Sequence, residues 1–439
     1  MFRNGPEYEA RLRKPFSPPS VTLKEIHAVV PKTLLQKSSS LGCYYVARDI
    51  VLATAFLGFA SYIPAMTQSL SAAAAPASWL AVPVASLLWC TYWWFQGLLW
   101  SGIFCLELTR VRLQAGHGSL FNSPLANNTV GFLLHSALLI PYFAWRSTHH
   151  AHHKATGSME RDENYIPRLR SDMGLPPAKV ARKADYAEIF EETPIWTLAR
   201  VLIMQAFGWW LYLSQNTLGA RMYPKGTNHF NPYSKLFKDH ERIYIVLSDI
   251  GIGTMTIILA WIVRRYGWWT VFKYYGAPYL ATNMWAVMFT YLHHSDPTIV
   301  HYYASEWTFL RGAAATVDRP LMGWMGRFFL HNISHDHVAH HFFVSAPFYN
   351  GPKITKRIRA VLGEHYNYDS TNTFYALWRS FTQCIFVEEE GGIVFYKNKY
   401  GEQARKLADG AFGRLRSETC TQALTRFARI IVGKPESGL

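Results

Sequence analysis

The sequence has few cysteines and, over long stretches, no charged residues. Its 439 residues include five cysteines, none in a C-x-x-C pair, so the sequence indicates neither a disulfide framework nor a thiolate metal site. They are Cys43, Cys90, Cys105, Cys384 and Cys420. The N-terminus is polar over about its first forty residues, and we therefore expect no cleavable signal peptide.

The longest uncharged stretch predicts a membrane hairpin. No Asp, Glu, Lys or Arg occurs from Ile50 to Leu106. Because roughly 20 apolar residues cross the hydrocarbon core of a bilayer, this stretch predicts two spanning helices, Val46–Met66 and Trp79–Cys105. Further charge-poor runs predict spans at Trp196–Tyr212 and Ile243–Val263, and a full or half span at Tyr274–Tyr291.

Asparagines and prolines interrupt another uncharged run, and we expect Thr129–Trp145 to form an interfacial or re-entrant helix. The 16 Trp and 25 Tyr fit a membrane protein, since their amphipathic rings favour the membrane interface. The sequence therefore predicts an all-α, multi-span helical membrane protein with about four to six spans and a histidine-rich cytosolic cap.

The formal net charge of +15 does not predict a nucleic-acid partner, because no compact basic stripe with stacking aromatics is present. Basic residues retained on the cytosolic side of a lipid bilayer explain the charge better. Ahead of the first predicted span these include Arg11, Arg13, Lys14, Lys24, Lys32 and Lys37. We expect a cytosolic segment 1–45 with a surface helix that Thr22 caps and Pro31 interrupts, a membrane and catalytic domain 46–399, and a cytosolic tail 400–439.

Two histidine boxes share one spacing. They are His149, His152 and His153 in STHHAHHK, and His337, His340 and His341 in DHVAHH. On a helix, positions i, i+3 and i+4 share a face, so three imidazoles can converge on one point, where a metal would replace their protons. A single box could be a surface turn that binds nothing, but two matching boxes favour metal ligands.

Two further histidines lie beside the predicted spans, in GHGS and YLHHSDP. The complete candidate set is His117, His149, His152, His153, His294, His337, His340 and His341. This set exceeds what one metal can use, so two metals are expected. Nitrogen ligands at a membrane surface suit a pair of irons that activate O₂, and a long apolar substrate would explain the membrane attachment. Glu160, Asp162 and Asp336 either orient the imidazole rings or are solvated loop charges.

Longer motifs resemble those of the membrane-bound fatty acid desaturases, in particular the delta-12 (oleate) desaturases of fungi and plants. The resemblance covers about Pro18 to Lys399. Besides the histidine boxes, it is carried by TLKEIHAVVPKTLLQKS, HYYASEWTFLRGAAATVDR, HNISHDHVAHHFF and NTFYALWRSFTQCIFVEEEGGIVFYKNK.

The resemblance implies a helical membrane enzyme of the endoplasmic reticulum with a cytosolic di-iron centre. Its substrate would be an oleoyl lipid, converted to linoleoyl with O₂ and two electrons from a b-type cytochrome and its NADH-dependent reductase. By matching position, the two boxes that include His149 and His337 would be the second and third iron-binding boxes, and His294 an additional ligand.

The first box departs from the pattern of the family, which has H-x-x-x-H. His117 matches the second histidine, but the first position falls on Leu113, and Arg110 and Arg112 stand where the family continues an apolar segment. Either the chain has lost an iron ligand or the coding sequence carries an exon-boundary error. We favour the error, because the other signatures are intact.

Three other functions remain open at the level of sequence. Relatives on nearly the same scaffold make triple bonds, conjugated double bonds, hydroxyl groups or further double bonds. A divalent-metal transporter would place ionisable residues within its spans, whereas these histidines lie beside the predicted spans. A catalytically impaired homologue would follow from Leu113.

Overall fold

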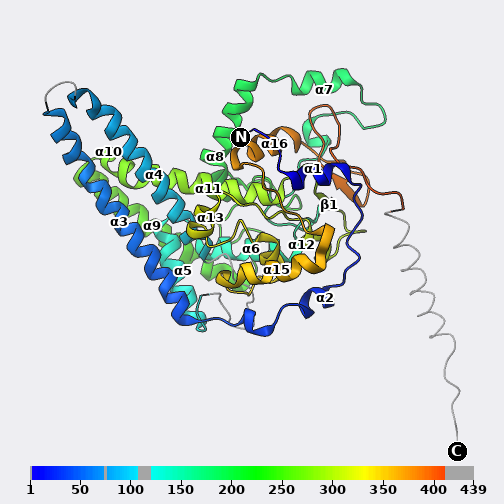
Figure 1. Cartoon of the computed structure of the whole chain (residues 1–439), viewed down its shortest axis with the longest axis horizontal. Coiled ribbons are helices and arrows are strands. Elements are labelled where there is room, and N and C mark those ends of the chain that lie inside the picture. Colours follow the sequence, from blue (N-terminus) through cyan, green and yellow to red (C-terminus); the bar gives the residue numbers. More distant parts are fainter. Residues whose placement is uncertain (1, 74–76, 107–119, 411–439) are drawn as a thin grey trace, which may run out of the picture.

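The computed structural model describes residues 2–73, 77–106 and 120–410, and this part of the chain is mostly helical, with almost no strand (Figure 1). The described strands are β1 (Val300–Tyr302) and β2 (Ile393–Phe395), which pair antiparallel with Val300 opposite Phe395. The predicted all-α class is therefore confirmed.

Helices α3 (Ser39–Ser71) and α4 (Ala81–Leu106) pack together as a hairpin that projects from the rest of the molecule (Figure 1). Ser38 caps α3 by accepting from the Leu41 amide. Apolar side chains on this helix face outward: Val51 is 65% and Tyr62 67% exposed. Exposed apolar surface of this extent indicates contact with lipid.

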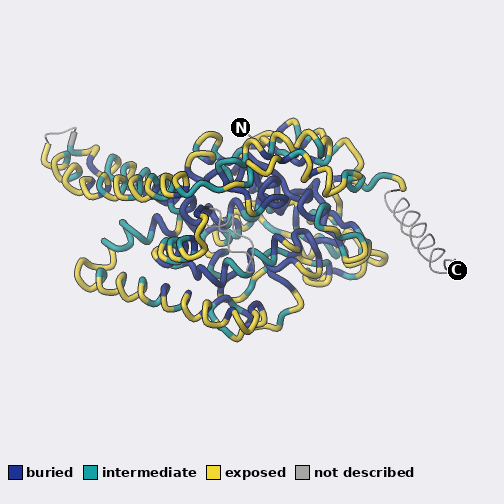
Figure 2. The backbone as a smooth tube through the Cα atoms, turned by 90° about the horizontal axis from the view of Figure 1, so that it is seen from below, coloured by how far each residue is buried: buried dark blue, intermediate teal, exposed yellow. Residues whose placement is uncertain are grey.

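By length and hydropathy, two described segments could cross a membrane: Ser39–Ser71, and Asp239–Tyr266, which includes α9 (Arg242–Tyr266). Ile257 and Trp261 on α9 are 72% and 63% exposed. The α3–α4 hairpin and α9 both carry many exposed residues (Figure 2). The chain is a membrane protein, while four to six spans stays a prediction.

One arm of the hairpin and two further helices contribute most of the main apolar core. They are α4, α8 (Pro194–Gln215) and α11 (Ala277–His294), and α11 packs against the other two. A side chain at Gly97 of α4 would overlap Ala281 of α11, so this close approach requires glycine. Between α9 and α11 lie α10 (Trp268–Val271) and a short π-helix, η5 (Phe272–Gly276).

The segment expected to be one interfacial helix is two helices, α5 (Pro124–Ala137) and α6 (Tyr142–Ala155). Leu139 has a φ of +53°, and Pro141 directly precedes α6. A left-handed residue followed by a proline cannot continue a helix. Because the chain turns here, α6 starts anew and carries the second histidine box.

Shorter elements form the cap around α6. Thr22 accepts from the Glu25 amide and starts α2 (Leu23–Ala28), as predicted, and Ile26 packs with Ile354 and Ile358 of α15 (Gly351–Leu362). The remaining elements are α1 (Pro6–Arg13), η1 (Lys32–Leu35), η2 (Ala77–Leu80), η3 (Ser171–Met173), α7 (Lys183–Phe190), η4 (Asp239–Glu241), α12 (Phe309–Ala314), α13 (Trp324–Phe329), α14 (His337–Phe342), η6 (Phe348–Asn350), η7 (Gly363–His365) and α16 (Thr373–Gln383).

A buried ion-pair network fixes the end of α11 to the cap. Arg319 donates to Asp296 at 2.6 Å and also pairs with Asp369, and Arg379 of α16 pairs with Asp369. These four side chains are at most 6% exposed, so each charge depends on its partners. Because Asp296 follows α11 by two residues, the network fixes the position at which His294 enters the cap.

Candidate metal centre

Three helices bring seven of the eight candidate histidines together. Helix α6 carries the second box, α14 carries the third, and α11 ends at His294. The seven described histidines are at most 9% exposed. His117 lies outside the described residues, as do Leu113, Arg110 and Arg112.

Five of the seven histidines line a cavity of about 690 Å³: His149, His152, His294, His337 and His340. Its apolar walls include Trp209 of α8, Val287 and Phe289 of α11, and Trp378 and Phe381 of α16. The volume and the mostly apolar walls are typical of a small-molecule site.

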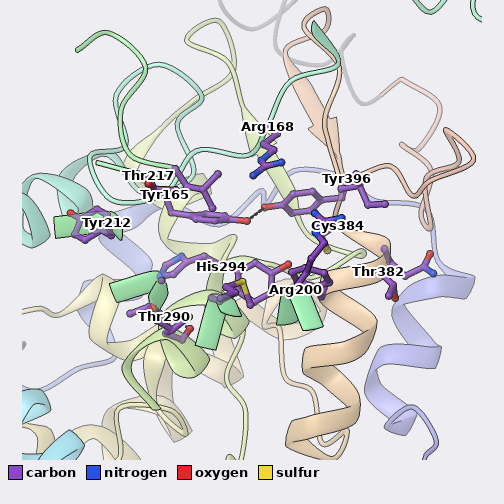
Figure 3. Close-up of a pocket in the computed structure, with 18 of the residues that line it drawn as sticks. Tyr165, Arg168, Arg200, Tyr212, Thr217, Thr290, His294, Thr382, Cys384 and Tyr396 are labelled. Atoms are coloured by element: carbon purple, nitrogen blue, oxygen red, sulfur yellow. Dashed lines mark hydrogen bonds between the residues drawn. The ribbon is translucent and has the colours of Figure 1, made fainter. Parts of the chain in front are cut away.

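Polar side chains occupy other parts of the same cavity. Figure 3 shows Tyr165 and Tyr396 on its wall pointing toward each other, with a hydrogen bond of 2.9 Å between their hydroxyls, and His294 below them in the view. Arg168 and Arg200 also line it. A long apolar molecule with a polar end could therefore reach the histidines.

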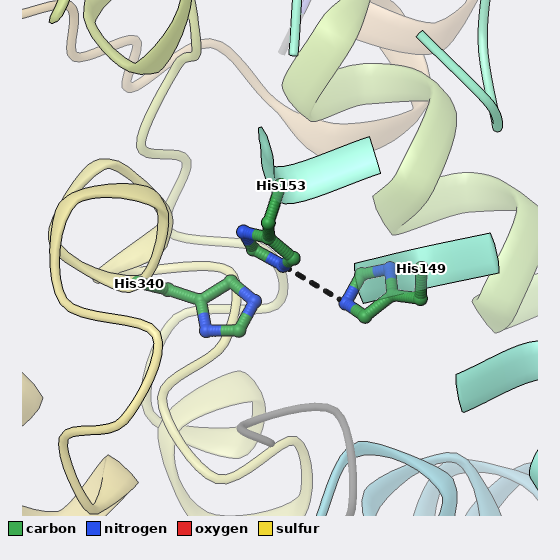
Figure 4. Close-up of side chains that lie close together, drawn as sticks. All are labelled: His149, His153 and His340. Atoms are coloured by element: carbon green, nitrogen blue, oxygen red, sulfur yellow. Dashed lines mark hydrogen bonds between the residues drawn. The ribbon is translucent and has the colours of Figure 1, made fainter. Parts of the chain in front are cut away.

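The histidines separate into two groups of three. Group 1 is His149, His153 and His340, and group 2 is His152, His294 and His341; within each group, one nitrogen from each ring lies within 4.8 Å of the others. In group 1, His149 and His153 approach each other with Nε2 atoms 3.0 Å apart (Figure 4). Each group therefore takes histidines from both boxes.

This division differs from the convergence that helical spacing alone predicts. Positions i and i+4 of the second box, His149 and His153, meet in group 1, whereas His152 at i+3 faces group 2. His337 belongs to neither group, but its Nε2 lies 3.1 Å from that of His294 and 3.0 Å from that of His341. This arrangement fits two metal positions, and each position is shared by histidines of both boxes.

The electrostatics of the groups suit cations. Burial, and then the neighbouring histidines, hold the pKa of His149, His153 and His341 well below the ordinary value, and burial lowers that of His340 to about 3. The rings are therefore neutral and carry lone pairs. His340 Nε2 has no hydrogen-bond partner in the described part of the chain. A divalent cation in each group would accept these converging lone pairs, so the residues fit a metal.

One of the three candidate carboxylates reaches a ring. Asp162 Oδ1 lies 2.6 Å from His152 Nδ1, so it can hold the ring proton there and leave Nε2 for a metal. Glu160 instead accepts from the Ala304 amide at 3.0 Å, and Asp336 pairs with Arg327 at 3.3 Å.

Sequence reasoning missed the neutral groups that contact the rings. Thr156 Oγ1 lies 3.1 Å from His341 Nδ1, and the Asn164 amide lies 3.4 Å from His149 Nδ1. Such residues have no characteristic spacing in a sequence. The only signal was that both closely follow the second box.

The sequence around this site is similar to that of known proteins. The fatty acid desaturase family matches residues 114–372. The delta(12) fatty acid desaturase of Mortierella isabellina is 38% identical over 384 residues, which cover 86% of this chain and 91% of that protein. The chain belongs to the fatty acid desaturase family. It is an enzyme, an oxidoreductase of the acyl-lipid desaturase type, as the sequence predicted.

Other relatives carry related activities. An oleate hydroxylase of Claviceps purpurea is 34% identical, over 88% of this chain and 82% of that protein. An acyl-lipid (9+3)-(E)-desaturase of Dimorphotheca sinuata is also 34% identical, over 88% of this chain and 94% of that protein. The desaturase family implies a metal cofactor, a lipid substrate and O₂, whereas the position and product of the reaction differ among the relatives.

Proposed function

We propose that this desaturase is a delta-12 enzyme that inserts a cis double bond into an oleoyl chain to give linoleoyl, with O₂ and electrons from a b-type cytochrome and its NADH-dependent reductase. The observation that carries the proposal is that both histidine groups contribute to the wall of a mostly apolar cavity. The 38% identity to a delta(12) desaturase supports the choice of bond.

The proposed ligands are those of two iron ions. His149, His153 and His340 would hold one, and His152, His294 and His341 the other; His337 stands beside group 2, and His117 is a further candidate. When bound, the irons supply O₂-dependent removal of hydrogen from an unactivated C–H bond.

The protein positions the substrate. The apolar walls would bind the acyl chain and exclude water from the reacting carbons. Asp162 would keep the His152 proton on Nδ1, so that the ring faces the metal with its lone pair. Arg168 and Arg200 lie where they could contact the polar end of a lipid.

The proposed location is the endoplasmic reticulum membrane, with the site facing the cytosol. The exposed apolar surfaces of α3 and α9 support membrane insertion, and the basic N-terminal segment supports the orientation. A glycosylation or protease-accessibility map of tagged termini in microsomes tests this topology.

Expression in yeast without delta-12 activity tests the reaction. Mass spectrometry of total fatty acids should detect linoleate when the chain is expressed, at a low level because Leu113 stands in the first box. A hydroxylated acyl chain would replace the proposal by the hydroxylase activity named for the Claviceps relative. The absence of any new fatty acid, with correctly inserted protein, would indicate a catalytically impaired homologue, as Leu113 allows.

A further inference from the structure

A chain of polar groups leads away from His149 of group 1. In the structure the Asn164 Nδ2 atom lies 3.4 Å from His149 Nδ1, and Asn164 Oδ1 lies 2.9 Å from the Tyr212 hydroxyl. That hydroxyl lies 3.1 Å from His229 Nε2, and His229 Nδ1 lies 3.3 Å from the Leu213 carbonyl oxygen. Tyr212 and His229 are buried, so their polar groups depend on one another.

The Leu213 carbonyl at the far end determines which group donates and which accepts in each hydrogen bond of this series. A carbonyl oxygen only accepts, so His229 Nδ1 carries the proton and donates to Leu213. Burial lowers the pKa of His229 to about 3, so the ring is neutral and its Nε2 accepts. The Tyr212 hydroxyl has one proton and donates it to that Nε2.

Because the Tyr212 proton is already given to His229, the Asn164 amide must be turned over relative to its placement in the structure, with its NH₂ toward the Tyr212 oxygen and its carbonyl oxygen toward His149. The two ends of an amide have nearly the same shape, so the hydrogen-bond network decides which end faces which partner. With this orientation His149 donates from Nδ1, and every donor in this series of polar groups faces an acceptor.

We infer that Asn164, Tyr212 and His229 are positioning residues that keep the His149 proton on Nδ1 and leave the Nε2 lone pair free for a metal. Nε2 is the atom that faces His153 in group 1, at 3.0 Å. If every donor and acceptor in the series were exchanged, the ring proton of His149 would lie on Nε2, where it would block a metal. The lone pair of His229 Nδ1 would then face the Leu213 oxygen, which is repulsive. The inference rests on the proposed function only in that group 1 holds a metal.

Two substitutions at Asn164 separate hydrogen bonding from packing. Asn164→Leu keeps a similar volume without an acceptor, and should weaken one of two metal equivalents about 10–100-fold. Asn164→Asp keeps an acceptor oxygen toward His149 and should bind within a few-fold of wild type. The probe is Fe²⁺ alone, titrated without O₂ into metal-free full-length protein in detergent, with bound metal measured by mass spectrometry.

Tyr212→Phe tests the chain at a more distant point and should lower affinity in the same direction. Tyr396→Phe is the matched control, because it removes a buried hydroxyl from the same cavity that is bonded to Tyr165 and not to this chain of groups. Its Fe²⁺ affinity should equal that of wild type.

Equal Fe²⁺ affinity of wild type and Asn164→Leu would overturn the inference. Equal losses in Asn164→Leu and Asn164→Asp would also overturn it, since the acceptor oxygen would then not matter. If Asn164→Leu aggregates, unchanged affinity in Tyr212→Phe overturns the inference. Wild-type protein that is well folded but binds no Fe²⁺ would contradict the proposed metal site itself, a separate result.

Discussion

The two histidine groups share two helices but are supported differently. In group 2, His152 faces the Asp162 carboxylate at 2.6 Å, whereas His149 of group 1 faces the neutral Asn164 amide at 3.4 Å. A carboxylate raises the basicity of an imidazole ligand more than an amide does. We therefore expect group 2 to hold its metal more tightly, and the two metals to be unlike in their affinity.

The same comparison explains why neither box suffices alone. Group 1 takes His149 and His153 from α6 and His340 from α14, and group 2 takes one histidine each from α6, α11 and α14. Each group is therefore completed only when helices that are far apart in the sequence have packed. Metal binding should accordingly stabilise the cap against unfolding.

The largest expected effect comes from removing one ligand from either group. His152→Ala in group 2 and His340→Ala in group 1 should each abolish linoleate in the yeast assay. Both side chains lie in the cap, so the amount of inserted protein should stay near that of wild type. Most of the activity persisting in either variant would show that its group is not part of the reactive site.

The next effect concerns the first box, which lies outside the described residues. Leu113 offers no lone pair, so we expect the chain as written to make little linoleate. Replacing Glu107–Ala115 by a short apolar run that ends in an intact H-E-A-G-H should raise linoleate by at least the roughly 10–100-fold associated with changes around a ligand. Equal product from both versions would mean that the first histidine is dispensable here.

A smaller effect should distinguish the two groups directly. Asp162→Asn removes the carboxylate from His152 and should lower the affinity of group 2 for Fe²⁺ about 10–100-fold, with group 1 nearly unchanged. Glu160→Gln is the control, because Glu160 accepts from the Ala304 amide and contacts no ring of either group. An equal loss from both groups in Asp162→Asn would indicate general damage to the loop.

The smallest effect is a pH dependence of the metal-free protein. The folded state depresses the pKa of His149, His153 and His341, whereas the unfolded chain takes up protons near pH 6.5. Stability should therefore fall as the pH drops below about 6.5, by up to about 1.4 kcal/mol per pH unit for each such histidine. A melting temperature that does not fall between pH 7 and pH 5.5 would contradict neutral, buried rings.

The family and the histidines that gather in the cap were accessible from the sequence because box spacing and long signatures are local patterns; their role as ligands stays a prediction. The division of the boxes between two groups could not be predicted from the sequence, because whether His152 faces one group or the other depends on where α11 and α14 pack. The break at Leu139 was missed for a related reason, since a left-handed leucine has no signature. Asn164 and His229 act through contacts that only the fold creates.

Metal content tests the central claim most directly. Full-length protein purified in detergent, in the repaired first-box version as well as the chain as written, should be analysed for all first-row metals per chain. The account predicts about two irons per chain, with His152→Ala and His340→Ala each losing about one. Zinc alone, or no metal in well-folded protein of either version, would contradict it.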